Sequence, residues 1–483
     1  MNQICARDRE LKLLDKLYHS GKSEFLAIYG RRRVGKTFLI REFFKNQKVV
    51  YFALTGVKGA SLRKQLKNFF EEFKRVFGTS QLQKPPKDWS SAFAELRQAI
   101  AGVNGKERII LFFDELPWLA TARSGFLQDL DHFWNRYMSE DARIVVIVCG
   151  SAASWMISKI IRNKGGLHGR LTAQIRLLPF DLKETEQFLE HRGIQLNRKA
   201  IIDIYMAIGG IPKYLNYVQK GLSAVQIINQ LCFEGPLESE FNELYSSLFE
   251  SYHRHVTIVK ALADSPCGLT KNALAKKCGL SPGGGMNLIL EELEQSGFIL
   301  TIRGFGNQKK ESRLKLIDEY SLFYLKWSSK TKENSLRTQD DQFWIRAFHT
   351  PQGRVWAGYA FEMLCLKHLS NIKKALGIEG VLTNASGWSV KPPKKSKEKG
   401  AQIDLLIDRA DNCINLCEMK YYNEEFVIDK SYDQELRNKK EVFLSHTKSR
   451  KSVFITLISP YGVKNNVGYF ETVDVNLSMN DLF

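Results

Sequence analysis

The sequence lacks closely spaced cysteine pairs. Its eight cysteines are scattered over 483 residues, and no two of them form a CxxC motif. Such pairs mark zinc knuckles, and regular sets of cysteines mark small domains held together by disulfides. We therefore expect neither kind of site, and we expect reduced thiols in a cytoplasmic protein.

Long apolar runs are also missing. The first ten residues, MNQICARDRE, contain no apolar stretch of the kind found in signal peptides, and the run at 144–149 is far shorter than a membrane span of roughly 20 residues. The sequence has no internal repeat and no extended low-complexity tract, the nearest being the lysine-rich KPPKKSKEK at 391–399. We expect a soluble protein with no membrane partner.

Acidic residues are too few to balance the basic ones. Against 71 Lys and Arg there are 52 Asp and Glu, which gives a formal net charge of +19. Clustered basic side chains release counterions from a phosphate backbone when they bind it. Nucleic acid is therefore the first partner to consider, ahead of an anionic membrane surface, and a merely solvated basic surface is the alternative. The domains described below make double-stranded DNA the expected nucleic acid.

The length and the apolar pattern indicate a multidomain α/β protein, because one core rarely serves a chain this long. Short apolar strands alternate with amphipathic segments over the first third of the chain, as in a parallel sheet covered by helices. The spacing then becomes helical, and three helices and a hairpin follow between 253 and 327. The predicted domains are an α/β core at 1–180, a helical lid at 181–240, a winged helix-turn-helix at 241–330 and a further α/β domain at 343–483.

The segment GRRRVGKT lies between an apolar strand and a helix, and it predicts a nucleotide site. In such a loop the backbone amides surround the phosphates, Lys36 reaches the β- and γ-phosphates, and the Thr37 hydroxyl binds Mg²⁺. ATP and Mg²⁺ are thus the expected cofactors. The residues expected to hold them here are Gly30, Arg31, Arg32, Arg33, Val34, Gly35, Lys36 and Thr37.

A later apolar strand, IILFF, is followed by two acids. Asp114 is placed to hold Mg²⁺, and Glu115 is placed to act as the base for an attacking water. One strand and two helical segments separate this motif from GRRRVGKT, which favours the branch of P-loop ATPases with an added strand and a catalytic glutamate. Hydrolysis of ATP, beyond binding alone, is therefore expected.

Two further residues are candidates for sensing the nucleotide. Ser151 follows the strand IVVIVCG and is positioned to contact the γ-phosphate, with an ordinary turn serine as the alternative. Arg170, in GGLHGRL, is a candidate arginine finger for its own or a neighbouring subunit, which would imply a homo-oligomer. His168 beside it is expected to be structural.

These stretches resemble a known family. ICARDREL, GRRRVGKT, FFDELPWL, CGSAASWM, HGRLTAQIRLLPF and GGIPKYL look like the archaeal-type P-loop ATPases of the AAA+ and STAND group, and they occur in the family's order. The resemblance covers residues 4 to about 217. It implies that Arg7 lies near the base of the nucleotide and that the GGIP segment belongs to a helical lid over it.

The C-terminal segment contains a second set of candidate residues. In GAQIDLLIDRADNCINLCEMKYY two apolar strands flank a polar turn, so that 408 pairs with 414, 406 with 416 and 404 with 418. Asp404 would then face Glu418, and two such carboxylates repel each other unless a cation such as Mg²⁺ lies between them. Lys420 points to the same face and is placed to orient or deprotonate the attacking water.

This D…ExK pattern resembles the PD-(D/E)xK nucleases, a restriction-endonuclease-like fold that the ATPase family is known to carry at its C-terminus. The proline of the signature is absent here. The resemblance implies that Glu362 joins Asp404 and Glu418 as a metal ligand, and that Lys430 and Gln434 approach the scissile phosphate. The alternative is a charged hairpin whose acids pair with Lys420 and nearby lysines.

The predicted function is therefore an ATPase whose nucleotide state gates a Mg²⁺-dependent DNA endonuclease, and the resemblance adds defence or mobile-element biology as an implication. The expected recognition helix, in LSPGGGMNLILEEL, carries few basic residues, so protein contacts are an alternative to DNA contacts for the winged helix. The lysine run at 391–399 fits a loop that tracks a nucleic-acid backbone, or a soluble insertion. Two other functions stay open: an ATP-dependent DNA-binding switch with an inactive nuclease fold, and a scaffold that oligomerises on ATP.

Overall fold

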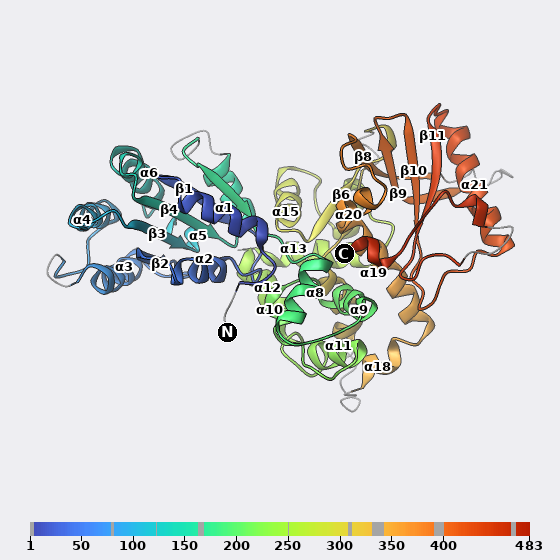
Figure 1. Ribbon diagram of the computed structural model, residues 1–483, viewed down its shortest axis with the longest axis horizontal. Helices are drawn as coiled ribbons and strands as arrows, with labels where there is room; N and C mark the ends of the chain where they lie inside the picture. The colour runs from blue at the N-terminus through green and yellow to red at the C-terminus, as the bar shows by residue number, and fades with distance from the viewer. Residues whose placement is uncertain are drawn as a thin grey trace. The chain divides into compact units, whose positions relative to one another are not determined.

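The protein folds into two compact units, Met1–Pro179 and Phe180–Phe483 (Figure 1). The computed structural model describes residues 4–78, 82–121, 123–162, 169–249, 251–307, 312–330, 342–390, 400–464 and 470–483. His168 and the lysine run at 391–399 lie outside these ranges. None of the helices within them combines the length and the apolar character that crossing a bilayer requires.

The first unit is built on a five-stranded parallel sheet with the strand order β2-β3-β4-β1-β5. The five strands predicted from the sequence are confirmed. β4 lies between β1, which leads into the glycine loop, and β3, which ends at Asp114. The strands are β1 (Glu24–Tyr29), β2 (Val49–Thr55), β3 (Arg108–Asp114), β4 (Ile144–Gly150) and β5 (Ala173–Arg176).

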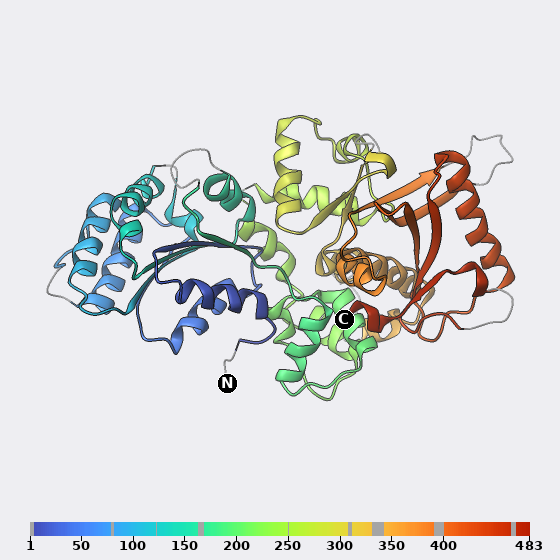
Figure 2. The same cartoon turned by 45° about the horizontal axis from the view of Figure 1, so that its top comes forward.

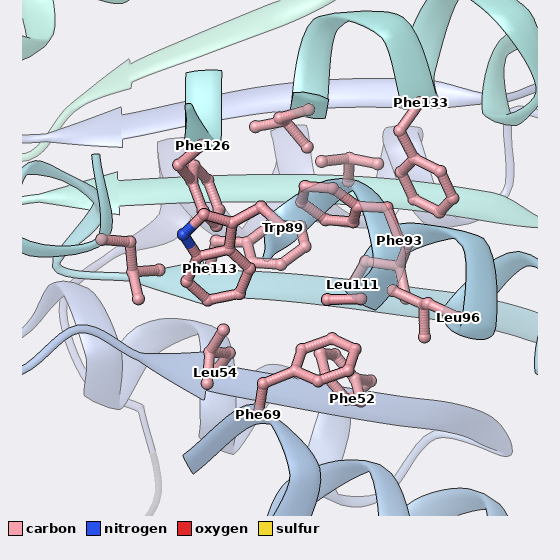
Figure 3. Close-up of a cluster of buried hydrophobic side chains, with 14 of the residues drawn as sticks. Phe52, Leu54, Phe69, Trp89, Phe93, Leu96, Leu111, Phe113, Phe126 and Phe133 are labelled. Atoms are coloured by element: carbon pink, nitrogen blue, oxygen red, sulfur yellow. The ribbon is translucent and has the colours of Figure 1, made fainter. Parts of the chain in front are cut away.

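Aromatic side chains fill the core between one face of this sheet and the helices α3, α4 and α6 (Figure 3). The Trp89 and Phe126 rings meet edge to face with centroids 4.7 Å apart, and Phe93 packs edge to face against Phe113 at 6.0 Å. Because Phe113 directly precedes Asp114, this packing fixes the end of β3. The helices are α1 (Asp8–Tyr18), α2 (Lys36–Lys45), α3 (Leu62–Phe77), α4 (Trp89–Ala101), α5 (Leu116–Leu119), α6 (Phe126–Arg136) and α7 (Ala153–Met156).

The second unit begins with the helices that the sequence predicts as a lid. Helix α8 starts with a capping box, in which the Asp181 and Glu184 side chains each accept a hydrogen bond from the other's backbone N–H. Helix α9 ends at Gly209, whose φ of 66° only glycine adopts readily. The helices are α8 (Leu182–His191), α9 (Arg198–Ile208), α10 (Pro212–Leu215), α11 (Ala224–Cys232) and α12 (Glu240–Leu248).

Three helices and an antiparallel hairpin follow in the predicted order. The side chain of Thr270 caps the second helix by accepting a hydrogen bond from the Ala273 N–H at 3.3 Å. The aromatic residues 320, 323, 324 and 327, which follow the hairpin, are buried. The elements are α13 (Tyr252–Ala263), α14 (Lys271–Cys278), α15 (Gly284–Gln295), β6 (Ile299–Ile302), β7 (Arg313–Leu316), α16 (Glu319–Phe323) and α18 (Phe343–Ala347).

The second unit ends in a mixed sheet with the strand order β12-β11-β10-β9-β8. β8, β9 and β10 are antiparallel neighbours, whereas β10, β11 and β12 run parallel. Figure 2 shows α21 running alongside this sheet. The elements are α19 (Pro351–Lys367), α20 (Leu369–Ala375), β8 (Thr383–Val390), β9 (Ala401–Arg409), β10 (Cys413–Met419), α21 (Lys430–Thr447), β11 (Ser452–Ile458) and β12 (Val475–Leu477).

Candidate functional site

The loop at 30–37 has a backbone with positive φ angles at Gly30, Arg33 and Gly35. Gly30 adopts a φ of 152°, and a Cβ atom at this position would lie 2.1 Å from the carbonyl oxygen of Leu177. Gly35 adopts a φ of 93° at the start of α2. The loop therefore turns sharply from β1 into the N-terminus of α2, where free backbone N–H groups favour the binding of a phosphate.

Lys36 lies within this loop and is 5% exposed. Its Nζ donates to the carbonyl oxygens of Gly30 and Arg31, both at 2.9 Å, and to the Ser151 hydroxyl at 3.0 Å. A single ammonium thus contacts both the loop and the end of β4. Ser151 therefore lies beside the loop, and its predicted role as a sensor of the γ-phosphate stays a prediction.

The two acids after β3 contact different partners. The Thr37 hydroxyl donates to Asp114 Oδ2 at 2.8 Å. Glu115 has a φ of 48°, and its Oε1 accepts a hydrogen bond from the Ser151 hydroxyl at 2.5 Å. Asp114 and Thr37 therefore bring a carboxylate and a hydroxyl together, which is a set of oxygen ligands that fits Mg²⁺. The Glu115 carboxylate contacts Ser151 instead.

The remaining residues predicted for the nucleotide occupy the same loop or flank it. Arg31 and Val34 are buried, Arg32 and Arg33 are half-buried, and Arg170 is exposed in the turn before β5. Arg7 donates to the carbonyl oxygens of Val34 at 3.3 Å and Leu178 at 2.9 Å, so it ties the loop to the segment after β5. The arginine-finger role of Arg170 and the nearness of Arg7 to the base stay predictions.

In the second unit, the antiparallel register of β9 and β10 is the predicted one for 408 with 414 and for 406 with 416. The ladder ends at the pair of Leu405 and Cys417, however, and does not continue to Asp404 and Glu418. The pairing of β8 with β9 shifts register at the same place, and Ile403 and Leu406 both join the apolar cluster around Phe443. Strict alternation, on which the predicted 404–418 pair depended, is broken by this irregularity.

Asp404 and Glu418 consequently have different partners. The Asp404 carboxylate accepts from Gln402 Nε2 at 2.7 Å and lies 3.9 Å from the Nζ of Lys315. Glu418 is 9% exposed, and Lys439 Nζ donates to both of its carboxylate oxygens at 2.9 Å. The D…ExK pattern did not indicate Lys315 or Lys439, because both lysines lie outside the segment 400–422 that contains the pattern.

Glu362, on α19, lies in the same electrostatic environment. Its pKa is raised to about 8, first by burial and then by the negative charges of Asp404 and Glu418, while Lys315 and Lys420 oppose the shift. Burial also raises the pKa of Glu418. The three predicted acids are therefore near enough to interact, and they do so from three different elements.

These acids are not arranged as a cation site. Within the residues that the structure describes, no group of three or more His, Cys, Asp or Glu side chains is placed to hold a metal ion. Lys420 Nζ lies 4.8 Å from the ring centroid of Tyr432, and Lys430 and Gln434 are exposed on α21. The metal-ligand and catalytic roles of the cluster stay predictions.

Tyr421, immediately after Lys420, takes part in a polar contact that the sequence did not indicate. The Tyr421 hydroxyl donates to Asp203 Oδ1 at 2.5 Å, and Lys199 Nζ donates to both Asp203 oxygens at 2.8 and 2.9 Å. Burial raises the pKa of Asp203 in spite of Lys199. The spacing of Lys199 and Asp203 on one helix face was a visible signal, but their partner 218 residues away was not.

Comparisons with known proteins give one family match, which lies in the first part of the chain, and several relatives that extend beyond it. Residues 5–218 match a family of ATPase domains found predominantly in Archaea. An uncharacterized protein of Methanocaldococcus jannaschii is 26% identical over 411 residues, which are 83% of this chain and 83% of that protein. An uncharacterized ATP-binding protein of the same organism is 44% identical over 43 residues, which are 9% of this chain and 73% of that protein.

Solved structures show more distant likenesses. The Walker-type ATPase of Pyrococcus abyssi is 20% identical with a TM-score of 0.48, and the match covers 67% of this chain and 96% of that one. The ORC2 protein of Aeropyrum pernix is 16% identical with a TM-score of 0.35, over 66% of this chain and 94% of that one. The family match and the geometry of the loop at 30–37 decide the assignment. Residues 5–218 form a P-loop ATPase domain of the archaeal type.

Proposed function

We propose that this ATPase acts on DNA, and that its nucleotide state gates a nuclease of the PD-(D/E)xK type in the C-terminal sheet. The observation that carries the proposal is the meeting of Glu362, Asp404 and Glu418 from α19, β9 and β10, with Lys420 two residues after Glu418. Three neighbouring carboxylates repel one another when they are ionised, so bringing them together costs folding free energy. Such clusters are typical of functional sites.

The order of elements around these acids supports the nuclease assignment. Helix α19 is followed by three antiparallel strands, then by α21, and then by β11 parallel to β10. This is the arrangement expected of a restriction-endonuclease-like domain, with the ExK segment at the end of its third strand. We likewise assign α13 to β7 as a winged helix, a fold that is able to contact a phosphate backbone.

In the ATPase unit, Thr37 and Asp114 would hold Mg²⁺, which when bound neutralises phosphate charge. Lys36, now bonded to two loop carbonyls and Ser151, would turn to the β- and γ-phosphates. Glu115 is the base for the attacking water, and Ser151 positions its carboxylate. The contact between Thr37 and Asp114 and the contact between Ser151 and Glu115 support these proposed roles.

Within the second unit, buried polar contacts connect helices α8 and α9 with the elements that carry Glu418 and Glu362. Tyr421 bonds to Asp203 of α9, and the Leu182 N–H at the start of α8 donates to His368 Nε2 at 3.1 Å, directly after α19. Burial lowers the pKa of His368 to about 4, so the ring is neutral and able to accept this bond. A movement of α8 and α9 would therefore be passed on to the two elements that carry Glu362 and Glu418.

The test is cleavage of supercoiled and linear DNA with Mg²⁺ or Mn²⁺, with and without ATP. The variant Glu418→Ala/Lys420→Ala should lose cleavage and keep ATP hydrolysis, whereas Lys36→Ala should lose ATP hydrolysis and the effect of ATP on cleavage. Lys440→Ala/Glu441→Ala, on the surface of α21, is the matched control and should cleave like the wild type. Cleavage that survives Glu418→Ala/Lys420→Ala would overturn the nuclease assignment.

A second candidate function has its own support. Both oxygens of Glu418 are taken by Lys439, and the described acids form no ready cation site. This arrangement favours an ATP-dependent DNA-binding switch that keeps a nuclease fold without its activity. A wild-type protein that shifts DNA in an ATP-dependent manner but cuts it with neither Mg²⁺ nor Mn²⁺ would decide for the switch.

A further inference from the structure

Two lysines that the sequence pattern did not indicate compensate the acids of the C-terminal sheet. Lys315, on β7 of the hairpin, is 4% exposed and lies 3.9 Å from Asp404 Oδ1. Lys439, on α21, contacts both oxygens of Glu418 at 2.9 Å. The acids are therefore neutralised from two sides, by residues of two different elements.

The position of Lys315 depends on how the hairpin is attached to the sheet. The Gly387 N–H of β8 donates to the carbonyl oxygen of Arg303, just after β6, at 3.2 Å. Phe305, in the turn of the hairpin, packs against Phe443 of α21 with ring centroids 5.2 Å apart. The hairpin is thus docked on the strands next to β9, and its docking brings the ammonium of Lys315 to Asp404.

A lysine and a divalent cation compete for the same oxygens. An ammonium that donates to both oxygens of a carboxylate occupies the lone pairs that Mg²⁺ or Mn²⁺ needs, and it adds a positive charge that repels the cation. In a buried position water screens this repulsion only weakly.

We propose that Lys315 and Lys439 are internal counter-ions that keep divalent cations from Asp404 and Glu418, and that cation uptake requires the hairpin to withdraw Lys315. The winged-helix segment would then control the nuclease site through a single buried charge. The inference rests on the proposed function in one respect, namely that a bound cation would serve the nuclease reaction.

The experiment is a titration of the nucleotide-free, full-length protein with Mn²⁺, followed by the electron paramagnetic resonance signal of the free ion. All proteins carry Asp114→Asn, so that the ATPase site adds no binding. Lys315→Met and Lys439→Met should each raise Mn²⁺ affinity by roughly tenfold or more, because each removes one positive charge next to these acids. Asp404→Asn added to Lys315→Met should abolish the gain.

The matched control is Lys451→Met. The Nζ of Lys451 lies 2.5 Å from Oδ1 of Asp408, which is on β9 like Asp404, so this variant removes the lysine partner of another acid on that strand. Its Mn²⁺ affinity should equal that of the starting protein. Lys315→Gln repeats the test with a polar side chain in case the methionine variant does not fold, and circular dichroism checks each protein. Equal affinities in the starting protein, both Lys315 variants and Lys439→Met would overturn the inference.

This outcome is separate from the fate of the nuclease assignment. Higher Mn²⁺ affinity without DNA cleavage in any variant would retain the counter-ion role and reject the nuclease. Cleavage by the wild type with unchanged Mn²⁺ affinity in the lysine variants would retain the nuclease and reject the counter-ion role.

Discussion

Ser151 holds the Glu115 carboxylate with two hydrogen bonds, one from its hydroxyl at 2.5 Å and one from its backbone N–H at 3.2 Å. The same hydroxyl accepts a hydrogen bond from Lys36 at 3.0 Å. The lysine of the phosphate loop and the acid at the start of α5 are therefore joined through one small side chain at the end of β4. This arrangement fits a group that positions Glu115, the residue that we propose as the catalytic base.

Replacing this hydroxyl should impair turnover more than binding. We expect Ser151→Ala to lower kcat for ATP hydrolysis by about 10- to 100-fold, with KM changed by less than about threefold, because Glu115 loses its orientation and the phosphate loop stays intact. Phosphate release at saturating and limiting ATP measures both constants. Ser158→Ala, an exposed serine shortly after β4, is the control. An unchanged kcat in Ser151→Ala would mean that Glu115 is positioned by other contacts.

Gly30 should tolerate no side chain. A methyl group there would lie 2.1 Å from the carbonyl oxygen of Leu177, on a backbone with a φ of 152°. We expect Gly30→Ala to reduce the free energy of unfolding of the first unit by more than about 3 kcal/mol and to abolish ATP binding.

The control for Gly30 separates conformational strain from the clash. Gly59 has a φ of 71° and no neighbour within 4 Å of an added Cβ. Gly59→Ala should therefore cost only about 1 kcal/mol of strain. Thermal unfolding and nucleotide binding measure the two effects, and similar losses in both variants would argue against a steric requirement at Gly30.

The sequence was sufficient for the parts of the protein that local patterns determine. Apolar runs such as the one at 144–149 predicted the parallel strands, and GRRRVGKT with the acids after IILFF predicted the nucleotide loop. The contact of Lys36 with Ser151 spans 115 residues but follows from the order of strands in such a sheet, since β1 and β4 are neighbours.

The C-terminal cluster shows where sequence patterns stop. Alternation along a strand predicted that Asp404 faces Glu418, but an irregularity between Ser386 and Trp388 shifts the register beside Asp404. Lys315 and Lys439 were not foreseen, because a surface lysine and a buried counter-ion look the same in a sequence. Only the packing of the hairpin and α21 against the sheet distinguishes them.

The bond between Tyr421 and Asp203 should contribute to the stability of the second unit. Asp203 is buried, and its carboxylate accepts hydrogen bonds from the Tyr421 hydroxyl and from the ammonium of Lys199. Tyr421→Phe leaves this carboxylate with less hydrogen bonding, so we expect the free energy of unfolding to fall by about 1–3 kcal/mol. Tyr422→Phe, at a neighbouring tyrosine that is 53% exposed, should change it by less than about 0.5 kcal/mol. Calorimetry of both variants tests this, and equal stability would show that the bond is replaced by water.

Glu362 should make the second unit less stable as the pH rises. Its pKa is raised from 4.5 to about 8, chiefly by burial, so between these pH values the folded unit holds a proton that the unfolded chain has released. Folding is then favoured at the lower pH, and the contribution of this carboxyl falls by roughly 3 kcal/mol between pH 5 and pH 8. Glu362→Gln cannot ionise and should remove this part of the dependence.

The measurement is calorimetric unfolding of the wild type and Glu362→Gln from pH 5 to pH 8, with EDTA present so that no divalent cation shifts the equilibrium. The difference between the two curves isolates Glu362 from Glu418 and His368, whose pKa values are shifted in both proteins. Glu379→Gln, at an exposed glutamate after α20, should follow the wild type. Parallel curves for the wild type and Glu362→Gln would mean that this carboxyl is ionised in the folded unit, and that Lys315 and Lys420 outweigh its burial.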